Sequence, residues 1–196
     1  MQRSSLLVFV ALLGSAATAF AERAENFTLP DQHGVTHELH GLAAAKAVVI
    51  LIQGNGCPIV RNAWPVYRQL RESYRERGVE FLLLNSNLQD DAASVRREAE
   101  AFKMDAPILL DQSQSVGESL SLIRTAEVLL IDPDTWEIVY RGPVDDRLTY
   151  EAQKPAATEH YLRDALDAVL AGQPIEVRRR EALGCLINFR DRRSSL

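Results

Sequence analysis

The chain alternates short apolar runs with stretches whose apolar residues recur every three or four positions. Residues 48–52 and 79–84 are nearly continuous apolar runs, typical of strands buried on both faces. Between them, residues 58–77 carry apolar side chains at helical spacing and predict an amphipathic helix. Pro58 suits the first turn of that helix, and Gly78 suits its end. The order strand, helix, strand predicts a parallel pair joined by a right-handed crossover.

Turn residues and apolar spacing predict further elements on either side of this unit. Upstream, residues 27–39 contain two short strands around a turn. Downstream, Asp90 or Asp91 is placed to cap a helix that runs to about Lys103. The remaining predicted elements are an extended segment at 106–111, a helix at 114–122, a hairpin with strands at 127–131 and 136–140, and a helix at 158–171. Because a hairpin adds antiparallel strands, we predict an α/β protein with a mixed central sheet and helices on both faces.

Cys57 follows the first long apolar run and directly precedes the predicted helix. Free backbone N–H groups and the positive end of the helix dipole converge at such a position. They favour the thiolate over the thiol, and the thiolate is the nucleophilic form of cysteine. A small, inert core residue is the alternative interpretation. The glycines at 54 and 56 favour the reactive one, which makes thiol chemistry the leading hypothesis.

Residues 1–21 have the pattern of a secretion signal. Arg3 supplies a positive start, residues 6–13 form a short apolar core, and residues 19–21 form a small-x-small cleavage site. The apolar core is much shorter than a membrane span requires, so an uncleaved anchor is the lesser alternative. We expect a cleaved signal, no stable membrane anchor in the mature protein, and a periplasmic or secreted location.

The rest of the chain is expected to form one domain over residues 22–174, followed by a tail over residues 175–196. The formal net charge is −5, and arginines cluster only at 178–180 and 190–193. Nucleic-acid binding normally needs a broad positive surface, so we do not expect it here. The chain also lacks a nucleotide-binding motif, and the chemistry that we expect needs no organic cofactor and no metal.

The chain has two cysteines, Cys57 and Cys185, and their spacing leaves three hypotheses open. In an oxidising compartment they can form a permanent structural disulfide. Alternatively, Cys57 is the attacking thiol and Cys185 the resolving one. A third hypothesis is a non-enzymatic copper-binding or assembly protein that uses these sulfurs with a histidine, because thiolate and imidazole both suit copper.

Several stretches resemble the redoxin branch of the thioredoxin fold, the alkyl hydroperoxide reductase/thiol-specific antioxidant family. The matching stretches are Phe-Thr-Leu-Pro-Asp at 27–31 with Gly34, Gly-Cys-Pro at 56–58, 74–79, 127–132, 140–142, 145–147, and Gly-Cys at 184–185. The resemblance implies a thioredoxin-like fold and an exported thiol-dependent oxidoreductase with a peroxidase-like activity. Its substrate would be a peroxide or a disulfide, and its reductant a thioredoxin-like protein. A homodimer is compatible with the resemblance.

The chain departs from this family pattern at three positions. Thioredoxins have a second cysteine three residues after the first, where this chain has Val60, so dithiol exchange within that motif is excluded. The peroxide-reducing members have a threonine three residues before the cysteine, where this chain has Gly54. Ala126 stands where the fold usually has a cis-proline that faces the cysteine. Because a cis bond is costly without proline, we expect the Thr125–Ala126 bond to be trans.

Two arginines are further candidate site residues. Arg61 lies one helical turn after Cys57 on the same side of the predicted helix, where it can stabilise the thiolate, position a peroxide or simply face solvent. Arg124 lies just before the predicted hairpin strand. The resemblance implies that an arginine near that strand helps to polarise the peroxide bond. The predicted catalytic residues are therefore Cys57, Cys185, Arg61 and Arg124.

Overall fold

The computed structural model describes residues 22–148 and 153–190, so the predicted signal at residues 1–21 lies outside it. A five-stranded sheet forms the centre, in the order β5-β4-β3-β6-β7. Its strands are β3 (Ala47–Gln53), β4 (Val79–Asn85), β5 (Ile108–Leu110), β6 (Val128–Asp132) and β7 (Glu137–Gly142). β3, β4 and β5 run parallel, whereas β6 pairs antiparallel with β3 and β7 antiparallel with β6. The sheet is therefore mixed, as predicted.

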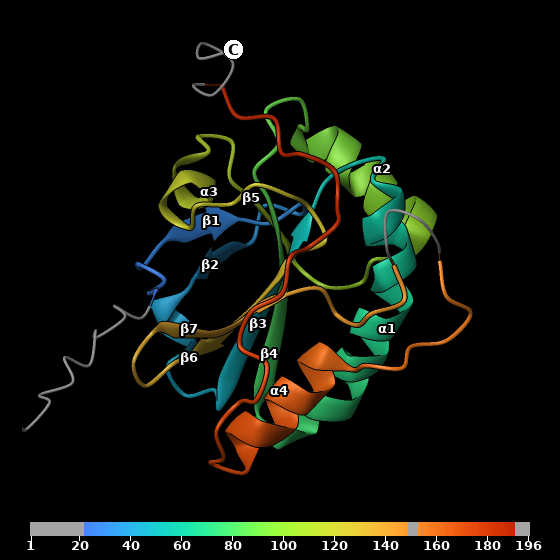
Figure 1. Ribbon diagram of the computed structural model, residues 1–196. Coiled ribbons are helices and arrows are strands. Elements are labelled where there is room, and N and C mark those ends of the chain that lie inside the picture. Colours follow the sequence, from blue (N-terminus) through green and yellow to red (C-terminus); the bar gives the residue numbers. More distant parts are fainter. Residues whose placement is uncertain (1–21, 149–152, 191–196) are drawn as a thin grey trace, which may run out of the picture.

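Helices cover both faces of this sheet (Figure 1). One face carries three helices, which are α1 (Pro58–Tyr74), α2 (Ala92–Phe102) and α4 (Tyr161–Leu170). The opposite face carries α3 (Ser115–Ser119) and a small two-stranded sheet made of β1 (Thr28–Pro30) and β2 (Thr36–Glu38). Two 3-10 turns, His40–Leu42 and Arg75–Arg77, complete the regular structure. No helix in the described ranges has the length and apolar character needed to span a bilayer.

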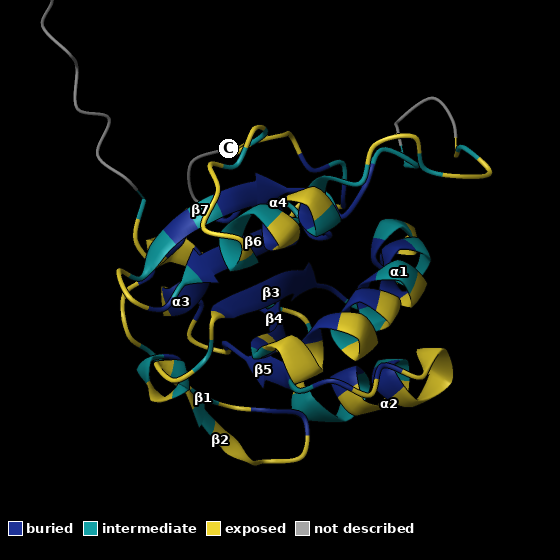
Figure 2. Cartoon of the chain, turned by 90° about the horizontal axis from the view of Figure 1, so that it is seen from below, coloured by how far each residue is buried: buried dark blue, intermediate teal, exposed yellow. Residues whose placement is uncertain are grey.

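β3 is buried along its whole length, because each of its faces packs into a separate apolar layer (Figure 2). Val49 and Leu51 face the layer under α1 and α4, while Val48, Ile50 and Ile52 face the layer under α3. Branched apolar side chains suit a strand with two buried faces. This strand ends directly beneath the start of α1, which fixes where Cys57 emerges from the core.

Two predicted helices are shorter in the structure because side chains capture their terminal backbone groups. Residues 158 and 159 do not enter α4, since their N–H groups donate to the Asp146 carboxylate at 2.9 and 3.1 Å. α3 ends before Ser121, which adopts a positive φ of 50°. The Arg141 guanidinium then donates to the carbonyls of Leu120 and Ser121 at 3.0 and 3.3 Å.

The C-terminal strap, defined as residues 182–190, runs across the end of the sheet at which β3, β4 and β5 finish (Figure 1, red). It lies antiparallel to residues 123–125, with Arg124 opposite Leu186. Ile187 and Phe189 are buried against the layer under α3. The apolar residues of the tail therefore pack back onto the domain.

Candidate active site

Cys57 is the N-cap residue of α1, with an extended backbone at φ −72° and ψ 113°. A tight turn delivers it there, because Gly56 adopts a φ of 75°, which costs glycine little. Pro58 then begins the helix, where the N–H that proline lacks would have had no partner within the helix. The Cys57 residue is only 2 % exposed. The fold thus places a nearly enclosed sulfur at the positive end of a long helix, as the sequence pattern predicts.

Thr125 and Cys185 meet the Cys57 sulfur from two other segments of the chain. The Thr125 hydroxyl donates a hydrogen bond to Cys57 Sγ at 3.0 Å. The strap brings Cys185 alongside, so that its thiol and its backbone N–H both donate to the same sulfur. The Thr125 N–H in turn donates to the Cys185 carbonyl at 2.9 Å. Both cysteines are free, with Cys57 buried and Cys185 exposed.

These contacts shift the two thiols in opposite directions. Burial opposes ionisation of Cys57, but the hydrogen bonds from Thr125, Cys185 and the Val60 N–H outweigh it and lower the pKa of Cys57. Burial and the neighbouring Cys57 sulfur raise the pKa of Cys185. Cys57 is therefore the sulfur of the pair that ionises first, because two adjacent sulfurs cannot both carry charge cheaply.

Arg61 is bound to α2 and not to the sulfur. Its guanidinium forms a bidentate ion pair with the Glu98 carboxylate, with N–O distances of 2.8 and 2.9 Å. The guanidinium carbon also lies 4.0 Å from the centroid of the Phe102 ring, in a cation–π contact. Glu98 raises the pKa of Arg61 most, and Cys57 contributes a smaller electrostatic effect. The same carboxylate accepts the Gly56 N–H at 3.1 Å. Arg61 and Glu98 together hold the turn that positions Cys57.

Arg124 is bound to the strap. Its guanidinium donates to the Gly184 carbonyl at 3.1 Å. The backbone at Gly184 packs directly against the backbone of Thr125, since a Cβ at Gly184 would lie 1.7 Å from the Thr125 carbonyl oxygen. Only glycine therefore allows the strap to lie against residues 123–125. The structure brings Cys57 and Cys185 together and places Arg61 and Arg124 around them, each in contact with a supporting segment; the catalytic roles of these four residues stay predictions.

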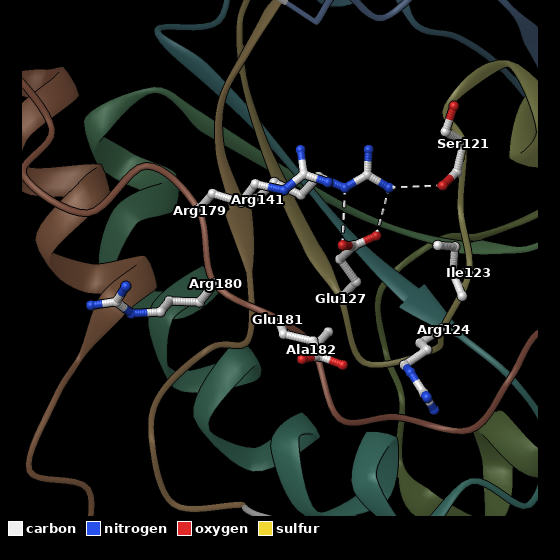
Figure 3. Close-up of a pocket in the computed structure, with 9 residues that line it drawn as sticks. All are labelled: Ser121, Ile123, Arg124, Glu127, Arg141, Arg179, Arg180, Glu181 and Ala182. Carbon is white, nitrogen blue, oxygen red and sulfur yellow. Dashed lines mark hydrogen bonds and ion pairs between the residues drawn. The ribbon is translucent and has the colours of Figure 1, made fainter.

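A cavity of about 600 Å³ lies at the beginning of the strap, between residues 179–182 and residues 121–127 (Figure 3). Several arginines line it, but their guanidinium groups do not converge: Arg124 and Arg180 point away from Arg141 (Figure 3). Arg141 is itself buried and bound to Glu127 at 2.8 and 2.9 Å. Arg141 and Arg179 also both pair with the Glu22 carboxylate, so acidic side chains of the chain already neutralise these two cations.

Thr125 is the site residue that the sequence reasoning missed. The chain departs from the resembling peroxidases at Gly54, where those proteins have a threonine. In the structure a Cβ at Gly54 would lie 2.4 Å from Asn87 Nδ2 and 2.7 Å from Thr125 Cγ2, so Thr125 and Asn87 together fill that space. The Thr125 hydroxyl then reaches the sulfur from the segment before β6. The signal available in the sequence was its position, immediately before Ala126, on the wall that faces the cysteine in this fold. The Thr125–Ala126 bond is trans, as expected.

The histidines lie away from the two sulfurs. His37 pairs with Asp31 at 2.9 Å, and His40 stacks on Trp136 with centroids 4.0 Å apart. Within residues 22–148 and 153–190, no three histidine, cysteine or acidic side chains gather as metal ligands would. The copper hypothesis therefore has no ligand set in the described residues.

A mixed sheet with a thiol at the start of the helix that follows its central strand defines a thioredoxin-like protein with a candidate redox cysteine. The putative thiol:disulfide interchange protein DsbE from Chlorobium tepidum has this fold, with a TM-score of 0.62 at 15% identity over 76% of this chain and 96% of that one. The sequence of residues 19–159 matches the family model for Redoxin. The chain belongs to the redoxin family.

Relatives of higher identity agree with this assignment. Thiol-disulfide oxidoreductase ResA from Halalkalibacterium halodurans is 29% identical over 111 residues, which span 57% of this chain and 61% of that protein. The ResA of Geobacillus kaustophilus is 28% identical over 67% of this chain and 80% of its own. An uncharacterized conserved protein from Geobacillus kaustophilus superposes with a TM-score of 0.78 at 28% identity, covering 87% of this chain and 92% of that one.

Proposed function

We propose that this protein is an exported thiol–disulfide oxidoreductase whose redox pair is Cys57 and Cys185. The observation that carries the proposal is the contact between the two sulfurs, of which the buried Cys57 has a lowered pKa and the exposed Cys185 a raised one. The relatives named thiol-disulfide oxidoreductase ResA support the same reaction class. The pattern of residues 1–21 supports export to the periplasm or beyond, where disulfide exchange is useful.

In the oxidising half of the cycle, the Cys57 thiolate attacks one sulfur of a substrate disulfide. A bond forms between Cys57 Sγ and that sulfur, and the other substrate sulfur leaves with the electron pair. Cys185 then loses its proton and attacks Cys57 Sγ, which releases the second substrate thiolate. The products are a reduced substrate and a Cys57–Cys185 disulfide. Because a thiolate of low pKa is a good leaving group, a dithiol reductant reopens this bond readily.

A small peroxide is the second candidate oxidant, and the enclosure of Cys57 favours it, since this residue is only 2 % exposed. Attack on the peroxide O–O bond would give a Cys57 sulfenic acid and an alcohol or water. Cys185 would then displace water and form the same disulfide. The Thr125 hydroxyl, which lies 3.0 Å from the sulfur, can hydrogen-bond the peroxide there.

Mass spectrometry of the oxidised protein tests the proposal. After equilibration in a glutathione buffer or with stoichiometric peroxide, we expect one intrachain disulfide between Cys57 and Cys185. In Cys185→Ser, we expect a glutathione adduct or a dimedone-trapped sulfenic acid on Cys57 instead. A protein whose thiols stay reduced in both treatments, or that cross-links only between chains, would refute this function. Adducts with glutathione but never with dimedone would leave a disulfide as the substrate.

A further inference from the structure

Glu98 lies where α2 meets the turn that carries Cys57. One oxygen of its carboxylate accepts the Gly56 N–H at 3.1 Å and the Arg61 Nε–H at 2.8 Å, and the other oxygen accepts from Arg61 Nη2 at 2.9 Å. The Glu98 side chain is only 11% exposed, against 34% for Arg61. The structure therefore keeps an anion, largely shielded from water, beside the start of α1 and next to the candidate nucleophile.

This anion and the Cys57 thiolate compete for the same positive surroundings. The free N–H groups and the dipole at the start of α1 favour negative charge. Glu98 takes the N–H of Gly56, the residue before Cys57. The Cys57 sulfur takes the N–H of Val60. Because a second negative charge nearby disfavours ionisation of a thiol, the Glu98 carboxylate opposes the thiolate that the hydrogen bonds to the sulfur favour.

Arg61 supplies the opposite charge, but Glu98 holds it. Arg61 lies one helical turn after Cys57. Glu98 raises the pKa of Arg61 most, and Cys57 adds to this increase through space. Every hydrogen bond that the guanidinium makes within the described residues goes to Glu98. The cation is therefore within electrostatic range of the sulfur while its charge is balanced by the carboxylate.

The other charged side chains on the elements around Cys57 are bound elsewhere. These pairings are Asp90 with the Asn55 N–H and the Asn85 amide, Asp145 with Arg147, Glu127 with Arg141, and Arg124 with the Gly184 carbonyl. The strap contributes the Cys185 thiol, which hydrogen-bonds the sulfur directly. The Arg61–Glu98 pair differs from the others because one partner binds the residue before Cys57 and the other stands one helical turn after it.

We propose that Glu98 is a positioning residue, which holds the positive charge of Arg61 back from the Cys57 sulfur and so limits how strongly the thiolate is stabilised. This inference rests on the proposed function, because it concerns the nucleophile of the same cysteine pair. The limit has a chemical use, since the nucleophilicity of a thiolate falls as its pKa falls. Glu98 thus preserves attacking strength in a sulfur that the rest of the site already helps to ionise.

A charge cycle in the Cys185→Ser background tests this role, because Cys57 is then the only cysteine of the chain. The variants are Glu98→Gln, Arg61→Gln and the double variant. Glutamine at position 98 still offers an oxygen to the Gly56 N–H, so the turn keeps its acceptor. The ultraviolet absorbance of the thiolate gives the titration midpoint of each protein.

We expect Glu98→Gln to lower the midpoint of Cys57 by about half a unit to one unit, because a nearby negative charge is lost. Arg61→Gln should raise the midpoint by a similar amount, since the Glu98 carboxylate then lies near the sulfur without its cation. The double variant should titrate close to the parent. Opposite shifts that cancel indicate two charges, whereas lost support for the turn would move all three midpoints in the same direction.

Two further variants separate charge from shape. Glu98→Asp keeps the charge on a shorter side chain, so its midpoint should lie nearer to the parent than to Glu98→Gln. Glu72→Gln removes a carboxylate from the exposed pair with Arg68 on the same helix, and its midpoint should overlay the parent. Amide exchange at Gly56 should stay close to that of the parent in Glu98→Gln, which shows that the turn is intact.

Reactivity per thiolate is the second measurement. At a pH where every variant is fully ionised, the Cys57 thiolate attacks one sulfur of hydroxyethyl disulfide, which is uncharged. A mixed disulfide forms, and mercaptoethanol thiolate leaves with the electron pair. Glu98→Gln should react about twofold more slowly than the parent, because its thiolate is less basic, and Arg61→Gln should react correspondingly faster.

An unchanged or raised midpoint in Glu98→Gln, or shifts of the same sign in all three charge variants, would overturn this role for Glu98. A Glu98→Gln protein that reacts as fast per thiolate as the parent, or faster, would do the same. None of these readouts needs the Cys57–Cys185 disulfide. A wild-type protein that never forms that bond would therefore refute the proposed function, whereas a failed charge cycle would remove only the role of Glu98.

Discussion

At the scale of single residues, the chemistry depends on the proton balance between two sulfurs. Cys57 sits at the start of α1 and accepts hydrogen bonds from Thr125 and Cys185, which lower its pKa despite burial. Burial and the neighbouring Cys57 sulfur raise the pKa of Cys185. A cysteine whose folded pKa is lowered carries its thiolate above that pKa and loses it as the pH falls through it. The Thr125 hydroxyl is therefore the most informative group to remove.

Thr125→Val should raise the pKa of Cys57 by about one unit, the worth of one hydrogen bond to a charged acceptor. The ultraviolet absorbance of the thiolate, titrated in the Cys185→Ser background, reports Cys57 alone. The titration midpoint should move to higher pH, while both proteins should reach the same absorbance at alkaline pH.

Thr28→Val in the same background is the control, because Thr28 lies exposed on β1. Its titration should overlay that of the parent. A Thr125→Val midpoint that also overlays the parent would show that the hydroxyl does not stabilise the thiolate.

At the scale of elements, the strap decides whether the second cysteine reaches the first. Its contact with residues 123–125 has no spare room at Gly184, whose added Cβ would lie 1.7 Å from the Thr125 carbonyl oxygen. Asn188 holds the C-terminal part of the strap in place, since its backbone N–H donates to the Asn87 side-chain oxygen at 3.1 Å. The strap is thus held on both sides of Cys185.

Gly184→Ala should detach this part of the strap, because overpacking a close contact costs about 1–3 kcal/mol. Amide exchange at Thr125 and Ile187 should become about tenfold faster or more, and the yield of the intrachain disulfide should fall. Hydrogen exchange and non-reducing peptide mapping measure the two effects.

The matched control is Gly41→Ala, where the added Cβ would meet only the Glu38 Cβ at an ordinary 3.7 Å. It should leave both readouts unchanged. Unaltered exchange in Gly184→Ala would mean that the strap tolerates a side chain at this position and adapts without lifting.

At the scale of the whole molecule, the redox pair links two regions that are far apart in the chain. Cys57 lies early in the domain, and Cys185 lies in the tail after α4. A disulfide between them would close almost the entire domain into one loop, which restricts the unfolded chain strongly. Oxidation should therefore change global stability as well as local chemistry.

We expect the oxidised protein to exceed the reduced protein in free energy of unfolding by about 2–4 kcal/mol. Urea denaturation with and without a reductant measures this difference. Cys185→Ser should give the same curve under both conditions. Equal stability of oxidised and reduced wild type would show that the disulfide, once formed, strains the folded state as much as it restricts the unfolded one.

Local sequence patterns were enough to predict the elements and the position of the nucleophile. The apolar runs at 48–52 and 79–84 became β3 and β4, and the periodic stretch after Cys57 became α1. The residues at which helices begin and end were less well predicted. α4 begins later than its apolar pattern because Asp146 holds the N–H groups of residues 158 and 159, a contact that depends on how the chain folds back.

The sequence by itself determined a mixed α/β fold with Cys57 at the start of a helix, because periodicity and turn residues act between near neighbours. Only the tertiary structure decided what surrounds that sulfur. The strap brings Cys185 to it, Thr125 and Asn87 fill the space beside Gly54, and the Arg61 guanidinium binds Glu98. These contacts join segments distant along the chain, and packing alone brings such segments together.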